Sequence, residues 1–371
     1  MPMSCLKFAV ALSTACAPWI AHAGPVDDCP LKEAPLSIDS PVLDVYLSAD
    51  AVAVVEKNWP GVHAVWPALT STKVPTFAAI VTLRSITPPE FQSLQRLDAE
   101  LRALPVTNAD RQARCARYDD ERPQFTIEKT KRPAVLVFEK ITGFRDEPSV
   151  TAARASFSEM ARRRGWSLVV TDKGGAMTPA VLDQFDVVVW NNVSGDVLTL
   201  SQRSAFRTYV ENGGGFVGVH GAGGDPQTFW PWYVDELVGA RFGGHPMNPQ
   251  FRDARINVAD PSDPIVAGLG KGWTMNDEWY SFKNNPRSNG ARIVATLDEE
   301  SYSPGGLAMG SDHPIAWTRC IGRGRSFYSA IGHRPESYSE PSNVRLLEQA
   351  VEWAAGKGGR SCSGLNRPSV P

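Results

Sequence analysis

The chain has 371 residues, a length that allows one large domain or two modest ones. Hydrophobic residues make up 42% of it, which is typical of a globular protein with a substantial core and excludes a disordered chain. The formal net charge is only −2, so there is no electrostatic reason to expect nucleic acid as a partner.

The first 23 residues are typical of a secretory signal peptide. Lys7 supplies a positive charge, a largely apolar stretch follows over residues 8–20, and small residues stand at Ala21 and Ala23. The apolar stretch is too short for a bilayer, which needs about 20 residues, and no other stretch is long and apolar enough. We therefore expect cleavage near Ala23 and a soluble, periplasmic or secreted protein without a membrane span.

Removal of this signal would leave four cysteines: Cys29, Cys115, Cys320 and Cys362. An even number in an exported chain favours disulfides, and buried free thiols are the alternative. Of the possible pairings we prefer Cys29 with Cys115, which would close the N-terminal region on itself. The second bridge, Cys320 with Cys362, would then fasten the C-terminal tail at 358–371 to a late strand.

Residues 24–130 differ from the rest of the chain, with frequent Pro, Asp and Ala and no run of buried strands. Helices are expected over 42–56 and 88–104, where apolar residues recur at helical spacing. The apolar run 77–83 is interpreted as one strand, and the polar stretch 111–123 as a linker. We expect a small, mainly helical accessory region.

From residue 131 to about residue 357 the chain alternates between buried strands and amphipathic helices. The expected elements are strands at 134–139, 168–171, 186–190 and 216–219, and helices at 149–164, 178–184 and 201–212. This alternation predicts an α/β domain with a parallel sheet covered by helices on both faces. Later elements are expected as strands near 255–258, 291–297, 314–318 and 326–331, and a closing helix at 341–354.

The most informative motif is the segment 213–225, with the sequence GGGFVGVHGAGGD. A short apolar strand ends there in a glycine-rich turn at His220, which is how α/β proteins present a side chain at the carboxyl edge of a parallel sheet. Ser or Cys at this position could form an acyl-enzyme, whereas an imidazole acts as an acid, a base or a metal ligand. We expect His220 to be exposed to a ligand; the alternative is a histidine that only hydrogen-bonds the turn.

Four histidines of the α/β region each stand at a strand end or beside Gly or Pro: His220, His245, His313 and His333. Ligands of parallel α/β proteins bind at the carboxyl ends of the strands, so we expect these histidines to converge there. His63 lies outside this region and is treated as structural.

Carboxylates and aromatic residues accompany these histidines. Asp277 and Glu278 are adjacent and would point to opposite faces of a strand, and we favour Glu278 as the one that faces the site. Histidines with a carboxylate suit metal-assisted or metal-free acid–base chemistry. Because the sequence has no His-Glu-x-x-His motif, a divalent metal such as zinc is a hypothesis without assigned ligands. Trp232 and Trp279 are our choices for stacking on a sugar.

Several short stretches follow one another in a specific order and spacing: residues 142–145, 186–191, 213–220, 230–233, 237–239, 277–280, 312–317 and 332–333. They resemble the trehalose-utilization (ThuA-like) family over about residues 133–356. The resemblance implies a flavodoxin-like fold, as in class I glutamine amidotransferases, and an involvement with trehalose, related disaccharides or their keto forms. Many members carry His-Asp where this chain has Asp146-Glu147, so Asp146 either substitutes for that histidine or marks an altered site.

These features predict an exported carbohydrate-active hydrolase, lyase or isomerase. Amidotransferase activity is excluded because the nucleophile is missing. The expected catalytic residues are His220, Glu278, His313 and His333. The expected contacts to a small carbohydrate are Asp225, Trp232, His245, Asp277, Trp279 and Asp312. The alternative is a non-catalytic sugar-binding module, in which the aromatic residues carry the affinity and the histidines only hydrogen-bond hydroxyl groups.

Overall fold

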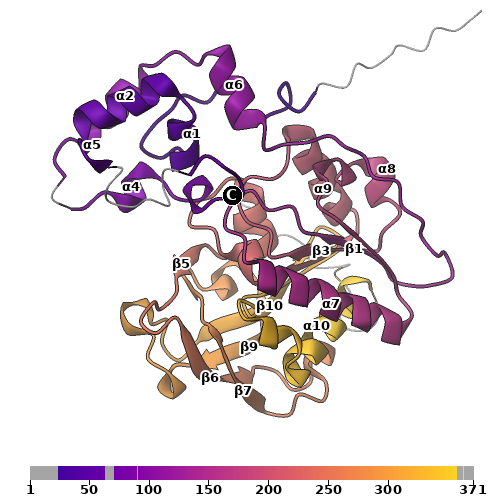
Figure 1. Ribbon diagram of the computed structural model, residues 1–371. Helices are drawn as coiled ribbons and strands as arrows, with labels where there is room; N and C mark the ends of the chain where they lie inside the picture. Colours follow the sequence, from indigo (N-terminus) through magenta and orange to yellow (C-terminus); the bar gives the residue numbers. More distant parts are fainter. Residues whose placement is uncertain (1–23, 63–70, 90, 357–361, 363–371) are drawn as a thin grey trace, which may run out of the picture.

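The computed structural model describes residues 24–62, 71–89, 91–356 and 362. The expected signal peptide and His63 lie outside these residues. Figure 1 shows a large α/β body with a helical N-terminal unit at one end. We use the name N-terminal unit for residues 24–130.

A nine-stranded sheet forms the centre of the α/β body, in the order β2-β1-β3-β4-β11-β10-β9-β6-β7. Its parallel part consists of β1 (Ala134–Phe138), β2 (Ser167–Thr171), β3 (Val187–Asn191), β4 (Gly215–Val219) and β11 (Gly324–Ser329). With β11 counted as the fifth strand, this is the 2-1-3-4-5 order of flavodoxin-like proteins, which confirms the predicted fold class. β1, β3 and β4 are buried along their whole length, as the apolar runs predict.

The other half of the sheet is antiparallel, so the expectation of a wholly parallel sheet is wrong. Its strands are β10 (His313–Ile321), β9 (Arg292–Asp298), β6 (Phe251–Val258) and β7 (Gly272–Glu278). The direction reverses between β10 and β11, because Ile321 pairs with Gly324 and only two residues join the strands. The first of them, Gly322, has a φ of +60°, which such tight hairpin turns require. A separate small sheet pairs β5 (Phe242–Gly244) with β8 (Ser281–Phe282).

Helices cover both faces of the parallel part. The chain runs from β1 outward to β2 and then back through β3 to β4, so right-handed crossovers place the first helix on one face and the later ones on the other. The covering helices are α7 (Glu147–Arg164), α8 (Pro179–Leu182), α9 (Leu200–Glu211) and α10 (Pro341–Ala354). Figure 1 shows α7 and α10 side by side in front of the sheet, where they also contact each other.

The N-terminal unit is partly helical and has a hydrophobic core of its own. Its helices are α1 (Val42–Tyr46), α2 (Ala49–Asn58), α4 (Leu83–Ile86), α5 (Leu94–Arg102) and α6 (Asn108–Cys115). The expected strand at 77–83 is wrong: Phe77–Ala79 is a turn of 3-10 helix, and Thr82 caps α4 through a reciprocal hydrogen-bonded box with Ser85. The expected linker at 111–123 is partly wrong, because α6 extends into it.

Both preferred cysteine pairings are confirmed. Cys29 is bonded to Cys115 at the end of α6, and Cys320 on β10 is bonded to Cys362. Across the part of the chain that the structure describes, no helix combines the length and the apolar character needed to cross a membrane.

Candidate functional site

Two histidines leave the sheet side by side at its carboxyl edge. β4 and β11 are parallel neighbours, and their last residues, Val219 and Ser329, are paired. His220 follows β4 directly, in the left-handed region with a φ of +40°. His333 follows β11 after a short loop in which Gly332 has a φ of +134°. The glycine turn therefore has the expected position at the strand edge.

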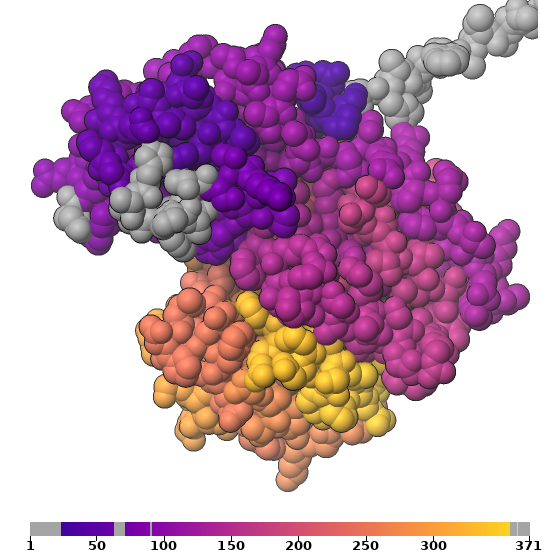
Figure 2. All heavy atoms as spheres, in the orientation of Figure 1, coloured from indigo at the N-terminus to yellow at the C-terminus, as the bar shows by residue number. Residues whose placement is uncertain are grey.

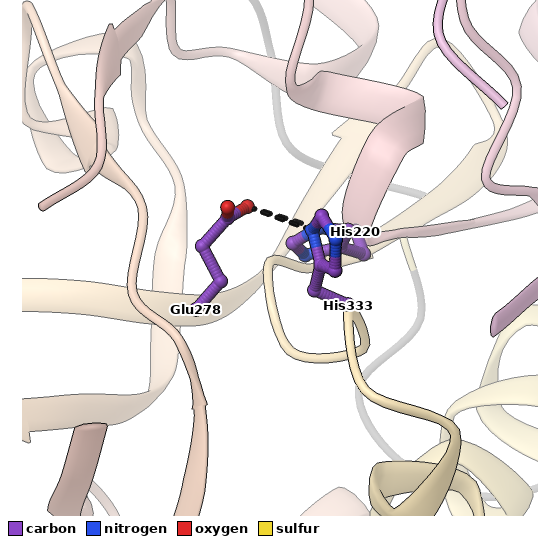
Figure 3. Close-up of side chains that lie close together, drawn as sticks. All are labelled: His220, Glu278 and His333. Atoms are coloured by element: carbon purple, nitrogen blue, oxygen red, sulfur yellow. Dashed lines mark hydrogen bonds and ion pairs between the residues drawn. The ribbon is translucent and has the colours of Figure 1, made fainter. Parts of the chain in front are cut away.

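Glu278 joins these two histidines from a distant strand. It is the last residue of β7, the edge strand of the antiparallel half, so the sheet curls enough to bring its two halves together. One carboxylate oxygen (Oε2) lies 3.0 Å from Nδ1 of His333 and 3.4 Å from Nε2 of His220. The two ring nitrogens are 3.2 Å apart. Figure 3 shows the three side chains pointing toward one another.

The surroundings of His220 determine its tautomer. Nδ1 lies 2.8 Å from the carbonyl oxygen of Ala330, which can only accept a hydrogen bond, so Nδ1 carries the proton. Nε2 is then left with a lone pair directed at Glu278 and His333. The side chain is buried, with 3% of the residue exposed, and its ring lies 4.3 Å from that of Tyr280. The expectation of an exposed His220 is therefore wrong, although the residue lines a cavity.

The charges of this group depend on one another. Burial raises the pKa of Glu278, but its contacts with His220 and His333 outweigh the burial, and the net pKa lies below its ordinary value. For His333, burial lowers the pKa, but the hydrogen bond and charge of Glu278 raise it above the ordinary value. Glu278 is therefore a carboxylate that can bind a cation, whether that cation is an imidazolium or a metal ion.

His245 and Gln250 hold the second oxygen of Glu278. Nδ1 of His245 is 3.1 Å from Oε1, and the amide of Gln250 donates to the same oxygen. Glu278 thus contacts three of the four histidines predicted to converge.

Asp277 has a positioning role behind the site. Its carboxylate is fully buried and accepts hydrogen bonds from the backbone N–H groups of Gly332, His333 and Arg334, and from the hydroxyl of Ser337. These bonds join the end of β7 to the loop that carries His333. Burial raises the pKa of Asp277, and the hydrogen bonds lower it only in part. Asp277 does not line the cavity, contrary to its predicted contact with substrate.

The three clustered residues face a cavity of about 650 Å³, a size that suits a small organic ligand. Asp225 and His245, both predicted to contact substrate, line this cavity as well. Asp225 accepts hydrogen bonds from Ser194 Oγ at 2.6 Å and from the backbone N–H of Gly195 at 2.7 Å. Burial nevertheless raises its pKa to about 7. Asp225 can therefore hold a proton near neutral pH.

His313 does not join this group. It is wholly buried at the start of β10, where Nε2 lies 2.8 Å from the carbonyl oxygen of Tyr280 and Nδ1 lies 2.7 Å from a carboxylate oxygen of Glu299. Both ring nitrogens are engaged inside the protein, so His313 fastens two segments together. The convergence predicted for four histidines holds for His220, His245 and His333 only.

Three other residues predicted to contact a sugar lie outside the cavity lining. Asp312 forms an ion pair with Arg287 at the surface, at 2.8 Å. Trp279 is fully buried, and its indole N–H donates to the carbonyl of Arg252. Trp232 packs against Trp230, with ring centroids 5.0 Å apart. These two tryptophans serve packing.

The sequence analysis missed several residues of the cavity. Asn192 directly follows β3, so the strand-end rule that identified His220 could have found it. Asp146, which replaces the histidine of many relatives, lines the cavity and also caps α7 by accepting from the backbone N–H of Ser149. The remaining residues are mostly apolar and had no signal: Phe77, Ile80, Val81, Ser85, Ile86, Phe144, Met247 and Tyr280 among them.

The cluster has the geometry of a metal site. Among the residues that the structure describes, His220, Glu278 and His333 are the one group of three whose donor atoms lie within 4.8 Å of one another. Their separations of 3.0–3.4 Å match the edge of about 3.3 Å that a tetrahedron with zinc–ligand bonds of about 2.0–2.1 Å would have. Two histidines and one carboxylate also form the facial set that holds iron(II) and similar ions. The bond from His220 Nδ1 to a carbonyl oxygen is the usual support of a metal-binding histidine.

A flavodoxin-like sheet with a histidine at the glycine turn defines an α/β protein of the glutamine amidotransferase-like class whose nucleophile is replaced. The family model of ThuA, described as trehalose utilisation, matches residues 134–354. The chain belongs to this family. No protein with a curated description matches it.

Two solved structures are similar. A ThuA-like protein from Bacteroides uniformis is 25% identical, with a TM-score of 0.53, and the match covers 62% of this chain and 95% of the other. A ThuA-like protein from Parabacteroides merdae is 20% identical, with a TM-score of 0.47, and the match covers 62% and 93%. The first supports the fold of the α/β body.

Proposed function

We propose that this protein is an enzyme that acts on a small carbohydrate in the cavity, with a divalent metal ion held by His220, Glu278 and His333. The observation that carries the proposal is the convergence of three donor atoms within 3.4 Å of one another at a cavity of about 650 Å³. The family description, trehalose utilisation, supports a carbohydrate as the substrate class.

The metal would supply a Lewis acid that polarises a carbonyl group or lowers the pKa of bound water. The chain's own residues supply the rest. His245 and Gln250 fix the carboxylate of Glu278 through Oε1, which leaves Oε2 for the metal. Asp225, whose pKa is raised to about 7, is placed to donate a proton to a departing sugar oxygen and to take one up afterwards. Such a set serves a hydrolase, a lyase or an isomerase.

Amidotransferase chemistry has no nucleophile here. The turn after β4 carries His220 where an amidotransferase needs a cysteine, and an imidazole cannot form its thioester. The four cysteines of the described chain are all in disulfides. The two disulfides also support the proposal that the protein is exported, because such bonds persist in oxidising compartments.

Metal analysis tests the proposal most directly. We expect about one equivalent of zinc, manganese or iron per purified protein chain, or uptake of one equivalent by chelator-treated protein in titration calorimetry. Glu278→Gln and His333→Ala should lower the affinity at least 10-fold, since each removes a ligand. Asp312→Asn, a carboxylate change outside the cavity, is the matched control and should leave affinity unchanged.

The same samples are then incubated with disaccharides and their keto forms. Turnover that disappears in Glu278→Gln supports the enzyme. Sugar binding without turnover, retained in His220→Ala, would establish the sugar-binding module instead. Turnover by metal-free protein would overturn the metal and leave acid–base chemistry by the same histidines.

A further inference from the structure

The N-terminal unit supplies one wall of the cavity. Phe77, Ile80, Val81, Ser85 and Ile86 line it, and all of them precede residue 134, where the family match begins. Figure 2 shows this unit, in indigo and violet, lying directly against the α/β body. We call these five residues the N-terminal wall.

The wall is held firmly in place from behind. The backbone N–H of Val42 donates to the carbonyl of Val81, and that of Arg84 donates to Ile38. Val81 belongs to the core of the N-terminal unit, whereas Ile80 belongs to neither large core although it is buried. Ile80 instead faces the α/β body and the cavity.

Gly143 allows the two parts to approach closely. A Cβ atom at this position would lie only 2.5 Å from Cγ2 of Ile80, so a side chain there would push the wall away. Beside this contact, the rings of Phe77 and Phe144 meet edge to face, with centroids 6.4 Å apart. The wall is therefore a fitted part of the site.

The two sides of the cavity differ in chemistry. The charged and ionisable groups, such as Glu278, His333 and Asp225, all belong to the α/β body. The wall is apolar except for Ser85, whose hydroxyl already donates to the carbonyl of Thr82 at 2.8 Å. Two large apolar side chains near it are unusually exposed, Phe144 at 44% and Met247 at 61%, so a ligand could cover them.

A sugar hydroxyl gains nothing against such a wall. Burying a hydroxyl group without a hydrogen-bond partner is unfavourable, and a disaccharide carries hydroxyl groups on both of its rings. An aryl or alkyl group, in contrast, is stabilised by burial against Phe77, Ile80 and Ile86. The cavity volume of about 650 Å³ accommodates both a sugar ring and such a group.

We propose that the substrate is a glycoside with an apolar aglycone, whose sugar ring lies at His220, Glu278 and His333 and whose aglycone lies against the N-terminal wall. This inference rests on the proposed function and names its substrate class. The N-terminal unit is then the part of the chain that determines specificity.

Binding measurements on the metal-loaded protein test it with phenyl and octyl glucosides, compared with methyl glucoside and trehalose. Both anomers of each glucoside are used. We expect the phenyl and octyl compounds to bind at least about 10-fold more tightly, because burial of several apolar carbons contributes more than one tenfold step in affinity. Ile80→Thr, which keeps the branched shape, and Phe77→Ser should each reduce that preference about 3-fold or more.

Leu200→Ser is the matched control, an exposed apolar residue that does not line the cavity, and should leave the preference unchanged. Equal binding of methyl and phenyl glucosides, no binding of any of them, or a preference insensitive to both wall variants would overturn the inference. Metal content, measured on the same samples, reports separately on the proposed function. A preference that persists without metal would therefore overturn the metal site and leave the aglycone wall standing.

Discussion

Glu278 is the residue on which the candidate site depends, because its two oxygens contact three histidines. His220 and His333 lie near Oε2, and His245 lies 3.1 Å from Oε1. A carboxylate that is buried and surrounded by ring nitrogens needs positive charge nearby, since an unpaired buried charge is strongly unfavourable. The same physics explains how one carboxylate can bring strand ends from opposite halves of the sheet to a single point.

His313 should behave in the opposite way to these residues. Replacing His313 with Ala leaves the carbonyl of Tyr280 and the carboxylate of Glu299 without a partner. We expect a loss of about 2–4 kcal/mol in the free energy of unfolding, from the lost hydrogen bonds and the space left behind. Metal content per folded chain should stay unchanged, as measured by metal analysis of protein whose folded fraction is known from denaturant unfolding. Loss of metal without loss of stability would return His313 to the site.

Asp225 predicts how the protein responds to pH. Burial raises its pKa to about 7, with Asp196 adding to the rise and Ser194 and Gly195 opposing it. Since the unfolded chain ionises this group near its ordinary pKa of about 4, the folded state binds more protons between about pH 4 and 7. The stabilisation is complete below pH 4 and is lost as the pH rises to about 7.

Asp225→Asn removes this titration and keeps the shape of the side chain. The melting temperature of the variant relative to the parent should therefore rise between pH 5 and pH 8, by a few degrees at most because Asp225 is partly open to the cavity. If Asp225 donates a proton in the reaction, the parent's rate should also fall above about pH 7. A difference in melting temperature that is constant over this range would contradict the raised pKa.

Among the elements, the loop after β11 depends on one carboxylate. Asp277→Asn replaces an acceptor of several hydrogen bonds with an amide whose NH₂ group faces backbone N–H donors. We expect a loss of about 2–4 kcal/mol in the free energy of unfolding and a weaker affinity for metal, because His333 is carried by this loop. Asp253→Asn on the exposed side of β6 is the control and should change neither quantity. A stability loss without any change in metal affinity would limit Asp277 to a structural role.

The parallel half of the fold could be predicted because its strands are buried on both faces and read as continuous apolar runs. The rule that ligands bind at strand carboxyl ends then led from β4 and β11 to His220 and His333. The same rule could not separate His313, which stands at the beginning of its strand. Residues 77–83 read as a strand because their apolar run carries no sign of the local hydrogen bonds that Thr76 and Thr82 form. Periodicity also says nothing about which unit packs over which edge, so the N-terminal wall had no sequence signal.

In the whole molecule, the disulfide between Cys29 and Cys115 links the start of the described chain to α6. The preceding residue, Asp28, accepts hydrogen bonds from Ser201 at the beginning of α9. The same short segment therefore fastens the N-terminal unit to the α/β body. Loosening it should reach the cavity, since that unit supplies the wall with Ile80.

Removing the two disulfides separately tests this arrangement. The first bridge closes a loop with a sequence separation of 86 residues and the second one of 42. The entropy of the unfolded chain therefore predicts losses of about 4–5 and about 4 kcal/mol, as upper values. We expect the Cys29→Ser, Cys115→Ser variant to lose more stability in denaturant unfolding than the Cys320→Ser, Cys362→Ser variant. We also expect only the first to weaken the preference for phenyl over methyl glucoside. If both variants keep that preference at temperatures where they are folded, the wall does not depend on this bridge.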